Sequence, residues 1–310
     1  MDALSEVLRL SSLAGAVLAD ATAGGAWCVS VPAATSRSFA HVVLEGECAI
    51  GIAGGEHVAL RAGDVAFLAR GEGHLIGSDH EAEALPFETL LRPPVAGELA
   101  PITLGGRGIR TRWVTLAITA DRHLAGPLFA ALPVVLKVSL RGSAPLAWLS
   151  DSLGLSLSGT DAPRPGGTAA LSRVAELVLI EALRRHVESL PPGGSGWLAG
   201  LNDRHVGAAL ALVHGRPGEH WTVERLARQV GLSRSALRER FSQVMGEPIF
   251  AFLTQVRLQL AAHELLTTTR SIEAIAEDAG YEAVTSFSRA FKRAFGKPPS
   301  VWRSKARRRR

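Results

Sequence analysis

Two stretches near the C-terminus decide the fold: TVERLARQVGLSRSALRERFSQVMGEP (222–248) and SIEAIAEDAGYEAVTSFSRAFKRAFGKPP (271–299), which align throughout. Apolar residues spaced i, i+3, i+4, i+7 share one face of a helix. In the first stretch this pattern falls on Val223, Leu226, Ala227 and Val230. It recurs 49 residues later on Ile272, Ile275, Ala276 and Ala279. Each stretch is therefore predicted to begin with a short amphipathic helix.

A glycine follows each of these helices, Gly231 in the first stretch and Gly280 in the second. Glycine accepts the positive φ that lets a chain turn sharply from one helix into another. The segments beyond the turn share a second apolar pattern, in which Leu237 and Phe241 correspond to Phe287 and Phe291. Each stretch therefore predicts a helix-turn-helix unit, at 222–244 and 271–295. A plain helical hairpin is the alternative for either copy alone.

The second helix of each unit is expected to present its outer face to the DNA major groove, where residues near the N-terminal half read base edges. The expected base contacts are Ser235, Arg238, Thr285, Ser288 and Arg289. The expected contacts to the phosphate backbone are Arg234, Arg240, Lys292 and Arg293. Between the units, 249–266 has a continuous helical pattern about 27 Å long, which suits recognition helices placed about one DNA turn apart.

The charge of the chain is unevenly distributed. Residues 201–310 carry 19 Lys and Arg against 10 Asp and Glu, whereas residues 1–200 carry 15 against 19. A basic C-terminal part on a mildly acidic body indicates a polyanionic partner for that part alone. The terminal run 307–310 is all Arg, for which a solvated tail is the simpler interpretation. A nonspecific nucleoid protein that binds through charge alone is one alternative.

Short apolar runs broken by turn residues fill 27–76, and TRWVTLAIT adds a further run at 111–119. This pattern predicts a β-meander or barrel. The segment 128–140 contains Pro133, which suggests irregular packing. A helix is predicted at 171–187 with apolar residues on more than one side, so that it either contacts a second subunit, the interpretation preferred here, or packs against the barrel.

The C-terminal pair resembles the AraC/XylS family of regulators, most closely in GYEAVTSFSRAFKRAFGKPPSVWR (280–303) and in WTVERLARQVGLSRSALRERF (221–241). The resemblance implies promoter DNA and RNA polymerase as partners, and an N-terminal domain that senses a ligand or mediates dimerisation. It places the family's base contacts at Ser235, Arg238, Glu239, Val284, Thr285, Ser286 and Arg289. Many members of the family have a basic or polar residue at the position of Glu239. The carboxylate of Glu239 could instead accept a hydrogen bond from cytosine N4.

The segment GDVAFLARGEGH (63–74) resembles the second cupin motif, with Ala69 where proline is usual. A tight turn at 45–46 would pair the flanking strands so that His41, Val43, Cys48 and Ile50 share one face. His41 and Cys48 could then join His74, with Cys28 or His80, in a metal site such as zinc or in a redox site. The alternatives are cysteines that act as small buried hydrophobes, a hydrogen-bonded histidine, and an organic effector in the barrel mouth.

The sequence thus predicts an α+β protein of two domains, an N-terminal cupin-like β-barrel and a C-terminal all-α tandem helix-turn-helix domain. The expected boundaries are 1–145 for the sensor, 146–200 for a helical dimerisation segment and linker, and 201–310 for the DNA-binding domain. The expected function is a homodimeric, sequence-specific transcription regulator controlled by an effector, metal or redox signal sensed in the N-terminal barrel, rather than an enzyme. A cupin dioxygenase or isomerase with an accessory helical domain is the alternative. Neither a membrane-spanning run nor a secretory signal is seen, which predicts a cytoplasmic protein.

Overall fold

The computed structural model describes residues 2–53, 55, 57–91, 101–157, 166–191, 193–216, 219 and 221–307, with side chains to 153 in α4 and to 304 in α13. The chain forms two compact units. The first comprises residues 1–12, 121–131 and 187–310, and the second comprises residues 13–120 and 132–186. Each unit has its own core and is described by itself.

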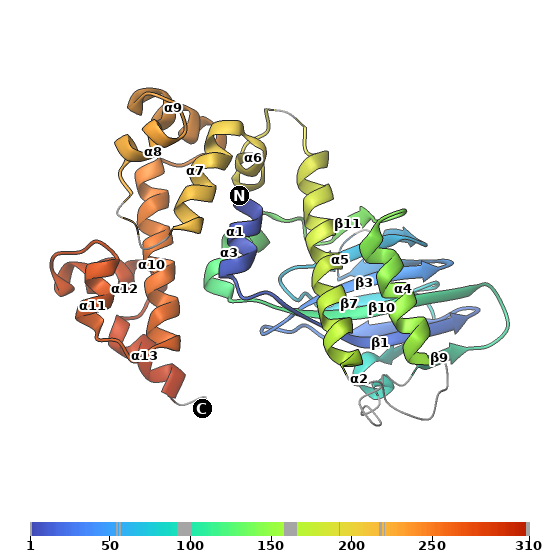
Figure 1. The fold of residues 1–310 in the computed structure, drawn as a ribbon. Helices are drawn as coiled ribbons and strands as arrows, with labels where there is room; N and C mark the ends of the chain where they lie inside the picture. Colours follow the sequence, from blue (N-terminus) through green and yellow to red (C-terminus); the bar gives the residue numbers. More distant parts are fainter. Residues whose placement is uncertain are drawn as a thin grey trace. The chain divides into compact units, whose positions relative to one another are not determined.

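The second unit contains two sheets (Figure 1). The order in the larger sheet is β11 (Leu136–Ser139), β6 (Asp64–Leu68), β3 (Ser38–Glu45), β10 (Arg110–Thr119), β1 (Ala14–Gly24) and β9 (Ile102–Gly105). The order in the smaller sheet is β5 (Val58–Arg61), β4 (Glu47–Ile52), β7 (His74–Gly77), β2 (Cys28–Val31) and β8 (Ala84–Pro86), with the short helix α2 (Phe87–Leu90) after it. The β-rich N-terminal domain predicted from the short apolar runs is therefore confirmed.

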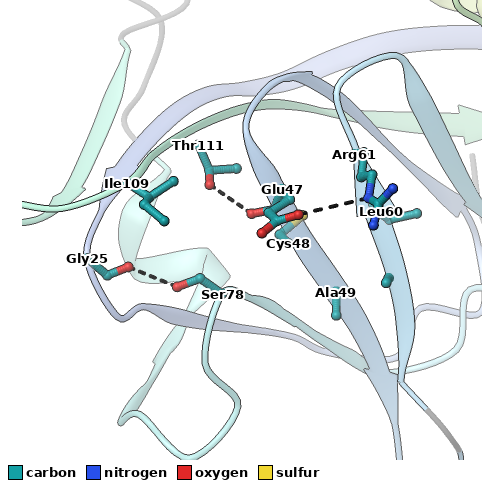
Figure 2. Close-up of a pocket in the computed structure, with 10 residues that line it drawn as sticks. Gly25, Glu47, Cys48, Ala49, Leu60, Arg61, Ser78, Ile109 and Thr111 are labelled. Carbon is teal, nitrogen blue, oxygen red and sulfur yellow. Dashed lines mark hydrogen bonds and ion pairs between the residues drawn. The ribbon is translucent and has the colours of Figure 1, made fainter.

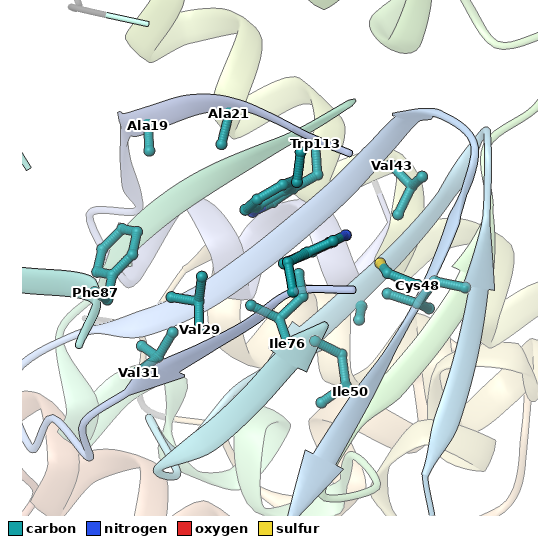
Figure 3. Packing of buried hydrophobic residues seen from close by; sticks show 14 of the residues in the cluster. Ala19, Ala21, Val29, Val31, Val43, Cys48, Ile50, Ile76, Phe87 and Trp113 are labelled. Carbon is teal, nitrogen blue, oxygen red and sulfur yellow. The ribbon is translucent and has the colours of Figure 1, made fainter. Parts of the chain in front are cut away.

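Side chains from both sheets pack together in one core (Figure 3). Strand alternation sends every second residue inward, so Val29 and Val31 of β2 meet Val43 of β3 and Trp113 of β10 in this layer. Trp113 stacks on Trp27 with ring centroids 4.2 Å apart. This large stacked pair anchors the end of the core at which β10 begins.

Two helices complete this unit, α4 (Ala144–Leu157) and α5 (Gly167–Ser189). The predicted helix at 171–187 is thus confirmed within α5. It packs closely on β1, because a Cβ added at Gly15 would lie 2.9 Å from the Ala175 Cβ. Its other stripe leaves Leu177 and Ile180 exposed. One apolar stripe is therefore covered by the sheet, and the other faces outward.

The first unit is helical and contains α1 (Ala3–Leu10), α3 (Arg122–Ala131), α6 (Trp197–Asn202) and α7 (Arg204–Gly215) before the tandem repeat. The first repeat consists of α8 (Val223–Gln229) and α9 (Arg234–Met245), and the second of α11 (Ile272–Asp278) and α12 (Val284–Phe295). Both turn glycines adopt positive φ, +73° at Gly231 and +81° at Gly280. Both predicted helix-turn-helix units are confirmed, and α13 (Pro299–Arg307) follows them.

A single long helix, α10 (Ile249–Thr267), serves both repeats. Its first half contributes Phe252 and Val256 to the core with α7, α8 and α9. Its second half contributes Ala262 and Leu265 to the core with α11 and α12. The predicted spacer is confirmed, and its 19 residues give a length of about 28 Å at 1.5 Å per residue.

Two segments from the N-terminal half of the sequence belong to the helical unit. Helix α1 packs on α7, and α3 packs on α10. Asp121, at the start of α3, accepts a hydrogen bond of 2.6 Å from Nδ1 of His263 on α10. The boundaries predicted from the sequence, at 145 and 200, divide the chain into consecutive segments and do not place residues 1–12 and 121–131 with the helical unit. These boundaries stay a prediction.

Candidate DNA-binding surface and sensor pocket

The recognition faces are the parts of α9 and α12 that their cores leave uncovered. Large apolar side chains of each helix face the core: Leu237, Phe241 and Met245 in α9, and Phe287 and Phe291 in α12. The predicted contact residues that are exposed are Arg234, Ser235, Arg238, Glu239, Arg240, Thr285, Ser286, Arg289, Lys292 and Arg293. Val284 and Ser288 are half-buried. Helical geometry therefore places ten of the twelve predicted residues outward.

Two of the arginines predicted to contact phosphate already form ion pairs with carboxylates. Arg234 is 2.8 Å from Glu224 of α8. Arg240 is 2.7 Å from Asp203, whose carboxylate also accepts backbone hydrogen bonds at the start of α7. These bonds hold the pKa of Asp203 below its usual value, although partial burial acts to raise it. A phosphate would have to replace these carboxylates before it could bind Arg234 or Arg240.

The other basic residues of the two faces have no such partner. Within the described parts of the chain, no ion pair involves Arg238, Arg289, Lys292 or Arg293. Three of these four lie on α12. The free positive charge of the surface is therefore concentrated on the second recognition helix.

The two helices also differ where they begin. Ser233 accepts a hydrogen bond from the Ala236 N–H at 3.2 Å and so caps α9. The equivalent residue before α12 is Ala283, which has no side-chain group able to cap. Since serine at this position commonly stabilises a helix by about 1 kcal/mol, α12 lacks a stabilisation that α9 has.

Inside the double sheet, His41 of β3 meets His74 of β7. Their Nε2 atoms are 2.7 Å apart, and His41 Nδ1 lies 3.1 Å from the Thr115 hydroxyl. His74 Nδ1 donates to the Glu72 carbonyl at 2.8 Å. Burial lowers the pKa of both rings, and for His41 the neighbouring His74 lowers it further. All four ring nitrogens have partners if both rings are neutral.

The pairing of β3 with β4 expected from a tight turn at 45–46 is wrong. β3 pairs with β10 and β6 in the larger sheet, whereas β4 pairs with β5 and β7 in the smaller one. The turn at Gly46 carries the chain from one sheet to the other, because the two faces must enclose one core. His41 and Cys48 are therefore not diagonal neighbours in a hairpin.

The five residues expected at a metal or redox site do not come together. No cluster of three His, Cys, Asp or Glu side chains suited to a metal is found among the described residues. The Nε2 atoms of His41 and His74 are hydrogen-bonded to each other at 2.7 Å. Two nitrogen ligands of a tetrahedral zinc ion would lie about 3.3 Å apart. His80 contacts His57 instead, with 3.2 Å between ring nitrogens. This arrangement does not fit a zinc site.

Cys28 and Cys48 are both buried and reduced. Cys28 stands opposite Gly77, and Gly77 stands opposite Ala49, so Cys28 lies two strands away from β4, or about 10 Å. Paired residues share one face of a sheet, so Ala49 lies on the same side as Cys28. Cys48, the neighbour of Ala49 along β4, faces the opposite side. A disulfide needs Cα atoms within about 7 Å. An intramolecular bridge is excluded without rearrangement of the sheet.

A pocket opens at the end of the double sheet near Gly46 (Figure 2). Its volume is about 470 Å³. It is lined by Gly25, Glu47, Cys48, Ala49, Ala59, Leu60, Arg61, Ser78, Ile109 and Thr111. This pocket was not predicted from the sequence. A signal for it was Ile109, a large apolar residue in the glycine-rich segment GGRGI (105–109), where a loop is expected.

Comparison with known proteins follows the same division of the chain. A family model described as a cupin matches residues 2–188, and one described as a helix-turn-helix domain matches residues 226–305. An AraC-like transcription regulator from Streptomyces antibioticus is 31% identical over 98% of both chains. The transcriptional regulator AlkR of Acinetobacter baylyi is 28% identical over 99% of this chain and 100% of its own.

Two further matches concern a third relative and a solved structure. The RCS-specific transcriptional activator RclR of Escherichia coli is 26% identical over 99% of both chains. The DNA-binding domain of AdpA, solved in complex with a target DNA, covers 35% of this chain and 96% of its own at 26% identity, with a TM-score of 0.32.

A cupin domain joined to two helix-turn-helix units defines a DNA-binding transcription regulator. The chain belongs to the AraC-like transcriptional regulators. In the part of the chain that the structure describes, no helix is long and apolar enough to cross a membrane.

Proposed function

We propose that this regulator binds promoter DNA sequence-specifically, with α9 and α12 in successive major grooves. The observation that carries the proposal is the pair of exposed recognition faces on α9 and α12, which α10 joins, with guanidinium groups at Arg238 and Arg289 that form no ion pair with a described residue. Arginine reads guanine through two hydrogen bonds, and such a contact requires a guanidinium that no carboxylate already holds. The base-reading set is Ser235, Arg238, Glu239, Val284, Thr285, Ser286, Ser288 and Arg289.

The basic residues proposed for phosphate contact differ in how readily they could bind a phosphate. Lys292 and Arg293 form no ion pair with a described residue, whereas Arg234 and Arg240 would first have to leave Glu224 and Asp203. The test is the salt dependence of DNA binding, because each phosphate contact adds about 0.9 to the slope of log K against log salt. Lys292→Ala should lower the slope by about 0.9.

Arg240→Ala is the matched control, because it removes the same charge from the same surface. The slope should then change less than it does in Lys292→Ala, because Asp203 already holds Arg240, while the protein keeps its fold. Equal changes in the two variants would overturn the assignment. Collapse of all sequence preference at physiological salt would overturn specific binding itself and favour a charge-only DNA binder.

We further propose that two copies associate through the outward faces of α4 and α5. Trp148 of α4 is half exposed, and Leu177 and Ile180 of α5 are each more than a third exposed. Apolar side chains gathered on one surface commonly mark an interface. Ile180→Asp should shift the protein towards monomer in sedimentation analysis, whereas Val134→Asp, at another exposed apolar residue of the same unit, should not. Identical sedimentation of the two variants would refute the dimer surface.

The cupin domain is proposed to sense a noncovalent effector and to control DNA binding, with RNA polymerase as the downstream partner in the cytoplasm. The name of RclR describes that protein as RCS-specific, but thiol chemistry is unfavourable here, because burial raises the pKa of both Cys28 and Cys48. The relatives are named as regulators, which supports a role without catalysis. Turnover of a small substrate by metal-loaded protein that binds no DNA would contradict this role.

A further inference from the structure

We propose that the pocket at the Gly46 end of the double sheet binds a small organic anion with an apolar body. This inference rests on the proposed function, in which the cupin domain senses an effector, and it names the site and the chemical class of that effector. Three features carry it: an exposed apolar wall, an unsatisfied buried donor behind the pocket, and a loosely paired guanidinium at the rim.

The apolar wall consists of Leu60 and Ile109. Ile109 is 75% exposed, although it lines a cavity of about 470 Å³, a volume typical of sites for small molecules. Its loop is anchored through backbone contacts, since a Cβ at Gly108 would lie 2.7 Å from the Gly25 Cα. An apolar molecule in the pocket would cover Ile109 without disturbing the core. The side chain is thus held where a ligand would bury it.

The core behind the pocket contains an unused hydrogen-bond donor. Thr111 lines the pocket, and Trp113, two residues further along β10, faces the same side of the strand. Trp113 stacks on Trp27, whose indole N–H is buried and has no partner among the described residues. Buried donors are nearly always satisfied, so an unpaired one indicates an absent acceptor. A ligand that reaches past Cys48 could supply that acceptor.

The charges at the rim favour an anion. Arg61 of β5 and Glu47 of β4 are cross-strand neighbours at the rim, with 3.9 Å between Nε and Oε2, and both are mostly exposed (Figure 2). Arg110 and Glu45 form a similarly loose pair beside Gly46. Arg107 in the 105–109 loop adds a further exposed cation. Because Glu47 holds Arg61 only loosely, the Arg61 guanidinium is available to an anionic head group at the rim.

The remaining polar groups do not select the ligand. The Thr111 hydroxyl donates to the Glu47 carbonyl at 2.9 Å, and the Ser78 hydroxyl donates to the Gly25 carbonyl at 2.9 Å. Burial raises the pKa of the Cys48 thiol to about 12, so the thiolate needed for covalent capture is scarce at neutral pH. Binding is therefore noncovalent and depends on apolar contact and charge.

The test titrates the full-length protein with 1-anilinonaphthalene-8-sulfonate and with N-phenyl-1-naphthylamine, which has the same rings without the sulfonate. We expect one saturable site that prefers the sulfonate. Arg61→Ala should weaken the sulfonate about three- to fivefold and leave the neutral probe unchanged. Ile109→Asp should weaken both probes by about tenfold. Arg173→Ala, at an exposed arginine on α5, is the matched control and should change neither.

Three results would overturn the proposal: equal affinity of the two probes, binding insensitive to Arg61→Ala and Ile109→Asp, or an equal effect of Arg173→Ala. DNA binding is measured on the same preparations without probe. Failure there counts against the proposed function alone, since probe binding is recorded separately.

Discussion

Acidification should destabilise the helical unit through His214, and the size of the effect can be worked from the structure. His214 lies on α7, only 7% exposed, against the ring of Phe252. Its Nε2 has no partner within the described residues. Burial lowers the pKa of His214 to about 4, although the nearby charge of Glu6 acts to raise it. The folded unit therefore holds this ring neutral.

The direction follows from proton uptake. Below pH 6.5 the unfolded chain protonates His214 and the folded chain does not, so the free energy of unfolding falls as the pH falls. The loss is about 1.4 kcal/mol per pH unit from pH 6.5 down to about pH 4, or about 2 kcal/mol between pH 6.5 and pH 5. Above pH 6.5 this contribution is fully present.

The assay compares urea unfolding of the wild type with that of His214→Leu at pH 7 and at pH 5, followed by far-ultraviolet circular dichroism. Leucine keeps the site apolar and does not titrate. The difference in unfolding free energy between the two proteins should change by about 2 kcal/mol between these pH values. A pH dependence shared by the two proteins within about 0.5 kcal/mol would refute the reasoning.

Three further outcomes are expected. Arg289→Ala should cost about 1 to 3 kcal/mol of DNA-binding free energy and relax specificity at one base position, and equal loss on all single-base variants of the site would contradict base reading. Ala283→Ser should stabilise the protein by about 1 kcal/mol in chemical unfolding by capping α12, with Ala283→Gly gaining less. Oxidised protein should show no bridge between Cys28 and Cys48 in non-reducing peptide mapping, and such a bridge would mean that the smaller sheet had rearranged.

The helical repeat could be predicted from the sequence because its signals are local. Apolar residues spaced three and four apart, with a glycine at the turn, determine both the helices and the outward faces of α9 and α12. The ion pairs Arg234–Glu224 and Arg240–Asp203 could not be predicted in this way. Each joins side chains of different helices, and which cation is held depends on tertiary placement.

The cupin domain was harder to predict in detail because sheet pairing is not local. The runs that form β2 to β6 are rich in Val, Ile and Phe, but β1 reads AGAVLADATAG, in which Ala and Gly predominate over the bulky residues that favour strands. The turn at Gly46 has the sequence of a hairpin and instead connects two sheets. The pocket draws on β4, β5, the start of β10 and three loops, so no single window of sequence contains it.

The central claim is that both recognition helices read DNA, and selection of bound fragments from genomic DNA followed by footprinting tests it most directly. We predict a site with two preferred blocks centred about 10 base pairs apart on one face of the duplex, because α10, about 28 Å long, joins the two units and is proposed to space α9 and α12 by about one DNA turn. Arg289→Ala should relax preference in one block and Arg238→Ala in the other. A single block, or fragments without shared sequence, would contradict the account.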